Sequence, residues 1–183
     1  MAADPDSDQD LLDRFVRGEA AAFERLYQRY RPFVMRIAQR FGSRDPDDAL
    51  DVLQEAFAWL IQKAPTLRLE HRLSTLLYPV TRHLARDRRV RRERAPAELS
   101  RPEQVAAGGP PVAAGEDLEA LLGGLSPLHR EVVLLRFAED LSLDEIAAAL
   151  EVPLGTVKSR LHHAIQKLRA RAGAIDRDFP AES

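Results

Sequence analysis

The chain has no cysteine, a single tryptophan and no long hydrophobic run among its 183 residues. Without cysteine it forms no disulfide bond and has no thiolate that attacks a substrate or holds zinc. A cysteine-free chain suits a reducing compartment, and we expect a cytoplasmic protein. No apolar stretch approaches the roughly 20 residues that cross a bilayer, and the acidic start MAADPDSDQD differs from a signal peptide. We therefore expect no insertion into a membrane.

The motifs of enzymatic chemistry are also absent. The sequence contains neither G-x-x-x-x-G-K-[ST] nor G-x-G-x-x-G, the glycine-rich loops that cradle nucleotide phosphates. Its histidines form no H-E-x-x-H or comparable cluster with carboxylates at the spacing of metal ligands. The chain is thus predicted not to be an enzyme, and we expect no catalytic residue, no metal site and no cofactor.

The net charge is only −2, from 27 basic and 29 acidic side chains, which excludes a uniformly basic coat for nucleic acid. The charge is nevertheless distributed unevenly. Residues 82–94 contain seven arginines against Asp87 and Glu93, and residues 155–172 contain five lysines and arginines with no acidic residue. Two local basic stretches in a near-neutral chain indicate two separate faces for a polyanion. On charge alone, two solvated helix faces explain them equally well.

Residues 96–116 differ in composition from the rest of the chain. They combine four prolines with glycines and alanines and contain few large apolar side chains. Such a segment buries too little apolar surface to offset the entropy of ordering, so it is predicted to be a flexible linker. The chain is thereby divided into a domain at residues 8–95, the linker at 96–116 and a second domain at 117–173.

In both domains apolar residues recur at steps of three and four, which indicates helices, and no stretch alternates with period two. An all-α fold is therefore predicted, with two small helical domains joined by the Pro/Ala/Gly-rich linker. The first domain is expected to have helices at about 11–16, at 23–41, from about 47 to before Pro65, and at about 73–94. Residues 66–72 are predicted to form a loop, and Pro79 is expected to kink the fourth helix or delay its start.

The second domain has the pattern of a helix-turn-helix. Ser126 before Pro127 is typical of an N-cap, and Ser142 with Glu145 forms a capping box that opens a short helix. A turn at 151–154 then leads to a long basic helix, and in such a pair the second helix lies in the DNA major groove. A helical hairpin with a solvated basic face is the less favoured alternative. The outward residues of the basic helix are the candidates for DNA contact: Thr156, Lys158, Ser159, Arg160, His162 and His163.

Three blocks of this second domain resemble a known family. They read L-S-P-L-H-R-E-V-V-L-L-R-F at 125–137, S-L-D-E-I-A-A-A-L at 142–150 and G-T-V-K-S-R-L-H-H-A at 155–164. In this order they closely resemble the C-terminal domain of the bacterial extracytoplasmic-function (ECF) sigma factors, of the sigma-70 family. The resemblance implies a transcription initiation factor that confers promoter recognition and opening on RNA polymerase. It also implies that the basic helix, through the six residues named above, reads the minus-thirty-five promoter element.

Two segments of the first domain resemble the same family. D-V-L-Q-E-A-F at 51–57 is similar to the D-x-x-Q-E-x-F motif with which the family binds the clamp helices of RNA polymerase. This implies that Asp51, Gln54, Glu55 and Phe57 contact core polymerase. L-L-Y-P-V-T-R-H-L-A-R-D-R-R at 76–89 resembles the segment that reads the minus-ten element and helps open the duplex. The contacts implied there are Tyr78, Arg82, His83, Arg86 and Arg89, and the loop at 66–72 is expected to pocket an extruded base.

The chain departs from the family at two positions, because Leu76 stands in place of a customary tryptophan and Pro79 in place of a polar residue. Stacking of an unpaired base on an aromatic ring contributes about 1 to 3 kcal/mol. If the family's tryptophan stacks on such a base, its replacement by Leu76 removes this contribution; if that tryptophan lies in the core, the replacement only changes the packing.

The resemblance implies three partners: core RNA polymerase, promoter DNA and an anti-sigma factor. Two alternatives remain from the sequence. One is a sigma-mimicking regulator that binds an anti-sigma factor in place of promoter DNA. The other is a polymerase-independent helix-turn-helix regulator, which would usually dimerise on paired half-sites.

Overall fold

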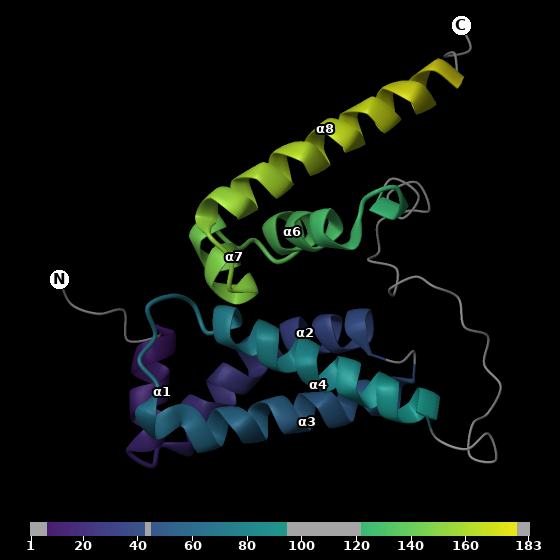
Figure 1. Ribbon diagram of the computed structural model, residues 1–183. Coiled ribbons are helices and arrows are strands. Elements are labelled where there is room, and N and C mark those ends of the chain that lie inside the picture. The colour runs from purple at the N-terminus through teal and green to yellow at the C-terminus, as the bar shows by residue number, and fades with distance from the viewer. Residues whose placement is uncertain (1–6, 43–44, 95–121, 179–183) are drawn as a thin grey trace, which may run out of the picture. The chain divides into compact units, whose positions relative to one another are not determined.

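The computed structural model of the chain describes residues 7–42, 45–94 and 122–178. For residues 172–178 it describes the helical backbone only. By its internal contacts the chain divides into two compact units, residues 1–110 and 111–183. All regular structure in the described ranges is helical, and the predicted all-α class is confirmed (Figure 1). The segment predicted to be the linker, 96–116, lies outside the described residues. Among the described residues, no helix combines the length and the apolar composition needed to span a bilayer.

The N-terminal unit consists of helices α1 (Asp8–Val16), α2 (Ala20–Phe41), α3 (Pro46–Lys63) and α4 (Ser74–Arg94), with a short 3-10 helix, η1 (Ala64–Thr66). Helices α2, α3 and α4 pack against one another, and α1 packs against α2 and η1 (Figure 1). Their facing sides bury large apolar residues such as Leu26, Ile37, Leu60 and Leu77, each fully inaccessible to solvent. The helices expected from the apolar spacing are confirmed.

Local signals explain where these helices begin and end. The Ser7 side chain caps α1 by accepting from the Asp10 amide, and Asp45 caps α3 by accepting from the Asp47 amide at 3.0 Å. Pro46 occupies the first position of α3, where its missing N–H is not needed. Gly18, at a φ of 96°, makes the turn between α1 and α2 in a conformation that other residues rarely adopt.

Proline does not delay α4. The helix begins at Ser74, before Pro79, and its first turn is fixed by the Leu77 amide, which donates to the Leu73 carbonyl at 3.0 Å. Pro79 therefore lies inside the helix, where one backbone bond is missing. Helix α2 likewise continues through a proline, Pro32, without ending there.

The C-terminal unit contains α6 (Pro127–Phe137), α7 (Leu143–Leu150) and α8 (Leu154–Asp178). Ser126 caps α6, and the capping box of Ser142 and Glu145 opens α7 with both of its hydrogen bonds formed. Glu151, in the left-handed conformation with a φ of 54°, ends α7 and turns the chain into α8. Helices α6 and α7 both pack on α8, so the predicted helix-turn-helix is present.

Candidate functional site

An acidic row runs along α3. This acidic row consists of the N-cap residue Asp45 and of Asp47, Asp48, Asp51 and Glu55. The first three lie at the helix N-terminus, where carboxylates interact favourably with the helix dipole. The other two extend the row for two further turns, because residues three and four apart lie on the same face of a helix.

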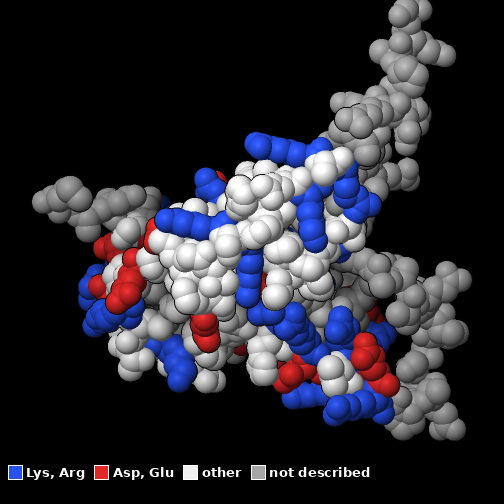
Figure 2. Space-filling model, turned by 45° about the horizontal axis from the view of Figure 1, so that its top comes forward, with Lys and Arg blue, Asp and Glu red and all other residues white. Residues whose placement is uncertain are grey.

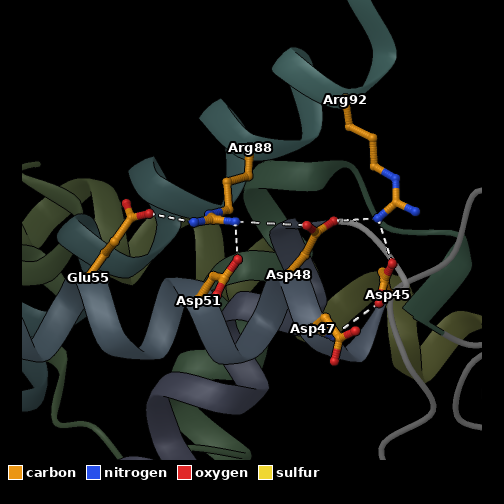
Figure 3. A network of polar contacts seen from close by, with 7 residues as sticks. All are labelled: Asp45, Asp47, Asp48, Asp51, Glu55, Arg88 and Arg92. Atoms are coloured by element: carbon orange, nitrogen blue, oxygen red, sulfur yellow. Dashed lines mark hydrogen bonds and ion pairs between the residues drawn. The ribbon is translucent and has the colours of Figure 1, made fainter. Parts of the chain in front are cut away.

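Arg88 of α4 reaches across to the acidic row (Figure 3). Its Nη1 donates to Asp51 Oδ2 at 2.6 Å, and its Nη2 donates to Glu55 Oε1 at 2.6 Å. Asp48 Oδ1 lies 3.9 Å from the same Nη1. These bonds, first the one to Glu55 and then the one to Asp51, raise the pKa of Arg88 above its usual range.

Arg92, one helical turn further along α4, joins the start of the row to α4. Its Nη1 lies 2.9 Å from Asp45 Oδ2 and 2.7 Å from Asp48 Oδ2 (Figure 3). The hydrogen bond from Arg92 is the main reason why the pKa of Asp45 is lowered, and the bonds to Asp48 and Asp45 raise the pKa of Arg92. Ion pairs thus join the first half of α3 to the last turns of α4.

The acidic row stays negative despite these pairs. Its five carboxylates and the two guanidinium groups sum to −3, and the side chains of Asp51 and Glu55 remain 50% and 46% exposed. Gln54 is exposed between them, and Leu50 and Ile61 expose 40% and 44% of their surface on the same helix. A half-exposed acidic surface with apolar side chains beside it suits a basic partner helix.

Phe57, predicted from the motif to contact core polymerase, lies in the core instead. It is 3% exposed, and Phe23 and Tyr27 of α2 cover it, with ring centroids 6.0 and 4.8 Å away. The physical reason is its register, because Phe57 occupies the face of α3 that packs on α2. It therefore supports the acidic row from inside the domain.

Tyr78, predicted to contact DNA, is also buried. It is 1% exposed and meets the ring of Phe41, at the end of α2, edge to face at a centroid distance of 6.2 Å. Leu76, two residues earlier, is half-buried, so the position that commonly holds tryptophan in the family is partly open here. The aromatic side chain of this segment is therefore part of the packing between α2 and α4.

The basic residues predicted on α4 do reach the surface. The guanidinium groups of Arg82 and Arg86 lie over the face of the Phe41 ring, 5.5 and 5.0 Å from its centroid, a cation–π arrangement. Arg82 is half-buried, whereas Arg86 and Arg89 are exposed. Phe41 thus holds two cations of α4 in place.

His83 and Arg89 each have an acidic neighbour on α4. His83 Nε2 lies 3.4 Å from Asp87 Oδ2, and Arg89 Nε lies 3.5 Å from Glu93 Oε1, both at exposed i,i+4 pairs. Exposed pairs of this kind contribute little stability, so both side chains can exchange these partners for phosphates.

The sequence predicts a face for a polyanion from the whole arginine run at 82–94 and does not single out Arg88 and Arg92 as partners of α3. A signal for them exists, because they lie four residues apart and the carboxylates of α3 recur at a matching spacing of three and four. Recognising this match requires knowing that α3 packs beside α4.

Helix α8 presents its predicted residues on the side away from its buried stripe. Val157 and Ala164 are fully buried, and Leu161 and Leu168 pack partly against the core. Of the predicted contacts, four are exposed (Lys158, Ser159, His162, His163) and two are half-buried (Thr156, Arg160). Figure 2 shows Lys and Arg side chains around α8, and no acidic residue lies between Gly155 and Arg171.

His163 is tied to α6 more closely than the sequence predicts. Its ring stacks on His129 of α6 with centroids 6.2 Å apart, and its Nδ1 lies 2.8 Å from the Ser159 carbonyl oxygen. Partial burial, followed by the charges of Lys167, His163 and Arg160, lowers the pKa of His129. Among the described residues no group of histidines and carboxylates could hold a metal ion.

Comparison with known proteins agrees with this geometry. Two family models match the chain: Sigma-70 region 2 at residues 26–95 and Sigma-70, region 4 at residues 121–170. The chain is 34% identical over 168 residues to the ECF RNA polymerase sigma factor SigE of Mycolicibacterium smegmatis, covering 83% of this chain and 63% of that protein. It is 32% identical over 166 residues to the RNA polymerase sigma-E factor of Streptomyces coelicolor, covering 90% and 93%.

A solved structure supports the same assignment. The sigma factor RpoE of Bartonella quintana, determined in complex with the anti-sigma factor NepR, superposes with a TM-score of 0.58 at 25% identity and covers 81% of this chain and 94% of that one. The two matched regions define the class as a two-domain promoter-recognition subunit of RNA polymerase. Since the Streptomyces relative matches over nearly its whole length, the chain belongs to the ECF sigma factors of the sigma-70 family. It is a transcription initiation factor, not an enzyme, and its partners are core RNA polymerase and promoter DNA.

Proposed function

We propose that the acidic row of α3 is the surface on which this sigma factor docks to core RNA polymerase, with Asp51, Gln54 and Glu55 making the contacts. The observation that carries the proposal is the residual charge. Arg88 and Arg92 neutralise the row only in part, and the carboxylates of Asp51 and Glu55 stay half-exposed. Phe57 acts from the core by keeping α3 in register with α2.

Helix α4 and the loop before it read the minus-ten element in this proposal. Arg82, His83, Arg86 and Arg89 contact the DNA, and Tyr78 serves as packing. Support comes from the cation–π contacts on Phe41, which order Arg82 and Arg86 on one side of the helix.

Helix α8 reads the minus-thirty-five element through Thr156, Lys158, Ser159, Arg160 and His162, with His163 at the edge of the contact. The domains follow the limits 8–95 and 117–173, joined by the linker at 96–116. Each domain alone has a small DNA footprint, and joining the two raises the effective concentration of one when the other is bound. The free chain therefore binds DNA weakly.

An anti-sigma factor holds the chain inactive in this proposal, supported by the Bartonella relative, which was solved with one. Because core polymerase and promoter DNA are found in the bacterial cytoplasm, the active form of the chain is located there in this proposal.

The test is transcription of a fragmented genomic library by core RNA polymerase with and without this chain, followed by sequencing of the new RNA starts. We expect starts that depend on the chain and share two spaced upstream elements. A chain with Asp51→Asn and Glu55→Gln should lose these starts, whereas Arg88→Glu, which breaks the same ion pairs but leaves both carboxylates in place, is the matched control and should keep them. New starts that persist undiminished with the double variant would refute the docking surface, and new starts that share no upstream elements would refute the assignment of α4 and α8 to promoter reading.

A further inference from the structure

The loop between η1 and α4 presents a short run of polar side chains. Glu70, His71 and Arg72 are all exposed, and the residues on either side, Leu69 and Leu73, are half-buried and fully buried. The run therefore projects from two anchored ends. Carboxylate, imidazole and guanidinium groups together can both donate to and accept from the edge of an unpaired base.

Two side chains of α1 bind the two ends of this run. Gln9 Oε1 accepts from the Leu69 amide at 2.8 Å, and Asp8 Oδ2 accepts from the Leu73 amide at 2.9 Å. Each bond joins residues 60 or more positions apart in the sequence. Consecutive residues at the start of α1 thus clamp both ends of an exposed loop, and the second bond also satisfies an amide where α4 begins.

Both clamping side chains are themselves held in place. The Asp8 side chain is only 9% exposed, and it accepts from the Tyr30 hydroxyl and from Arg29 Nη1, the latter at 2.8 Å. Burial, together with the hydrogen bond to Asp8, raises the pKa of Tyr30, which stays protonated as a donor. Gln9 Nε2 donates to Asp13 Oδ1 at 2.8 Å, which turns the amide oxygen of Gln9 toward the loop.

We propose that Asp8 and Gln9 are positioning residues for base recognition: they hold the loop so that Glu70, His71 and Arg72 meet an unpaired base of the promoter in one fixed geometry. This rests on the proposed role of the N-terminal unit at the minus-ten element. The clamp acts on backbone amides, and the loop between them carries the recognising groups. A recognising side chain discriminates between bases only if its supporting backbone is held within a fraction of an ångström.

Gln9 is the residue that tests the clamp, because Asp8 also binds Tyr30 and Arg29 and its replacement endangers the fold. Gln9→Met removes the acceptor for the Leu69 amide at similar volume. The double variant Gln9→Glu with Asp13→Asn keeps an acceptor oxygen at position 9 and, with donor and acceptor exchanged, the hydrogen bond to position 13 that orients it. Val16→Ala, at an exposed position near the other end of α1, is the control. Glu70→Ala, His71→Ala and Arg72→Ala combined, which we call the alanine loop, remove the recognising groups and keep the Leu69 and Leu73 amides to which the clamp binds.

Each full-length variant is combined with core polymerase and offered promoters randomised across the minus-ten element, and open complexes are sequenced. We expect Gln9→Met to reduce discrimination at one or two adjacent positions by about 5- to 150-fold, the range of a single base mismatch. The double variant Gln9→Glu with Asp13→Asn, and Val16→Ala, should keep wild-type discrimination. The alanine loop should lose discrimination at the same positions as Gln9→Met, and adding Gln9→Met to it should change nothing further.

Affinity for core polymerase and the melting midpoint of each variant are measured alongside. The proposal is overturned if Gln9→Met preserves discrimination while the alanine loop loses it, or if the alanine loop preserves it. It is also overturned if Gln9→Met weakens every position equally together with a lower melting midpoint, since that is the result of a structural role. A wild-type chain that binds polymerase and opens no promoter would instead refute the proposed function itself.

Discussion

The carboxylates of Asp51 and Glu55 have two roles that mutation must separate: they bind Arg88 within the domain and, as we propose, they bind core polymerase. Neutralising both removes two ion pairs of 2.6 Å whose side chains are 26% to 50% exposed. Because solvent screens such pairs, each is worth about 0.3 to 1 kcal/mol. Asp51→Asn with Glu55→Gln should therefore lower the free energy of unfolding by about 0.6 to 2 kcal/mol, or roughly 2 to 16 °C in melting midpoint for a small domain.

Charge reversal separates the two roles more sharply. Asp51→Lys with Glu55→Lys places two ammonium groups beside Arg88, and a repulsion of about 1 kcal/mol in water at 4 Å adds to the lost pairs. Adding Arg88→Glu restores attraction between α3 and α4 with the polarity exchanged. The melting midpoint should then return toward that of the wild type.

Polymerase affinity should respond differently. The two lysines oppose a basic partner helix, and losing a charge pair at an interface costs about 2 to 5 kcal/mol, which is roughly 30-fold or more in the dissociation constant. Arg88→Glu does not remove the lysines, so the triple variant should bind core polymerase as poorly as the double. Arg88→Glu alone is the control: it should destabilise the domain and leave the acidic docking surface in place.

The two measurements are thermal unfolding followed by circular dichroism and competition between labelled wild-type chain and each variant for core polymerase at two salt concentrations. A triple variant that regained polymerase affinity together with stability would refute the reasoning. In that case Asp51 and Glu55 would act only by holding α3 against α4.

Three further outcomes are expected. Arg160→Ala should weaken promoter binding by the holoenzyme at one or two base pairs of the minus-thirty-five element, by about 1 to 3 kcal/mol; an equal loss on all sequences would make Arg160 a phosphate contact. Phe57→Ala should cost about 3 to 5 kcal/mol in unfolding free energy, because it leaves a cavity under α2; an undiminished melting midpoint would contradict its core position. Since the pKa of His129 is lower in the folded state than in the unfolded state, its contribution is fully present above the unfolded pKa of about 6.5 and is lost as the pH falls from there toward the folded pKa. Thermal melts between pH 7.5 and 5 should show this loss, and His129→Gln should reduce it.

Capping and turn signals allowed the helices to be predicted from sequence. Ser126, Ser142 and Glu145 mark helix starts because the bonds they form lie within three residues, and the structure has all of them. The left-handed turn at Glu151 falls where the helix-turn-helix spacing requires it. Such features depend on neighbours along the chain, so tertiary structure does not alter them.

The sequence does not predict which side chains of a motif face the core and which face the solvent. Tyr78 and Phe57 belong to motifs associated with binding, but a motif contains core and surface residues together, and only the packing of α2 shows that these two face inward. The bonds from Asp8 and Gln9 to the loop join residues that no periodicity connects. Each of these features depends on contacts between distant segments.

The arginine run of α4 illustrates how packing divides a uniform charge. Arg82, Arg86 and Arg89 follow one another at steps of four and three and so share one side of the helix, and two of them lie over Phe41. Arg88 and Arg92, four apart on another side, bind the acidic row. In the function that we propose, α4 carries cations for DNA beside an acidic docking helix. Arg88 and Arg92 pair with the nearest carboxylates of the acidic row, and the stripe of Arg82, Arg86 and Arg89 on another side of the helix contacts the DNA in this proposal.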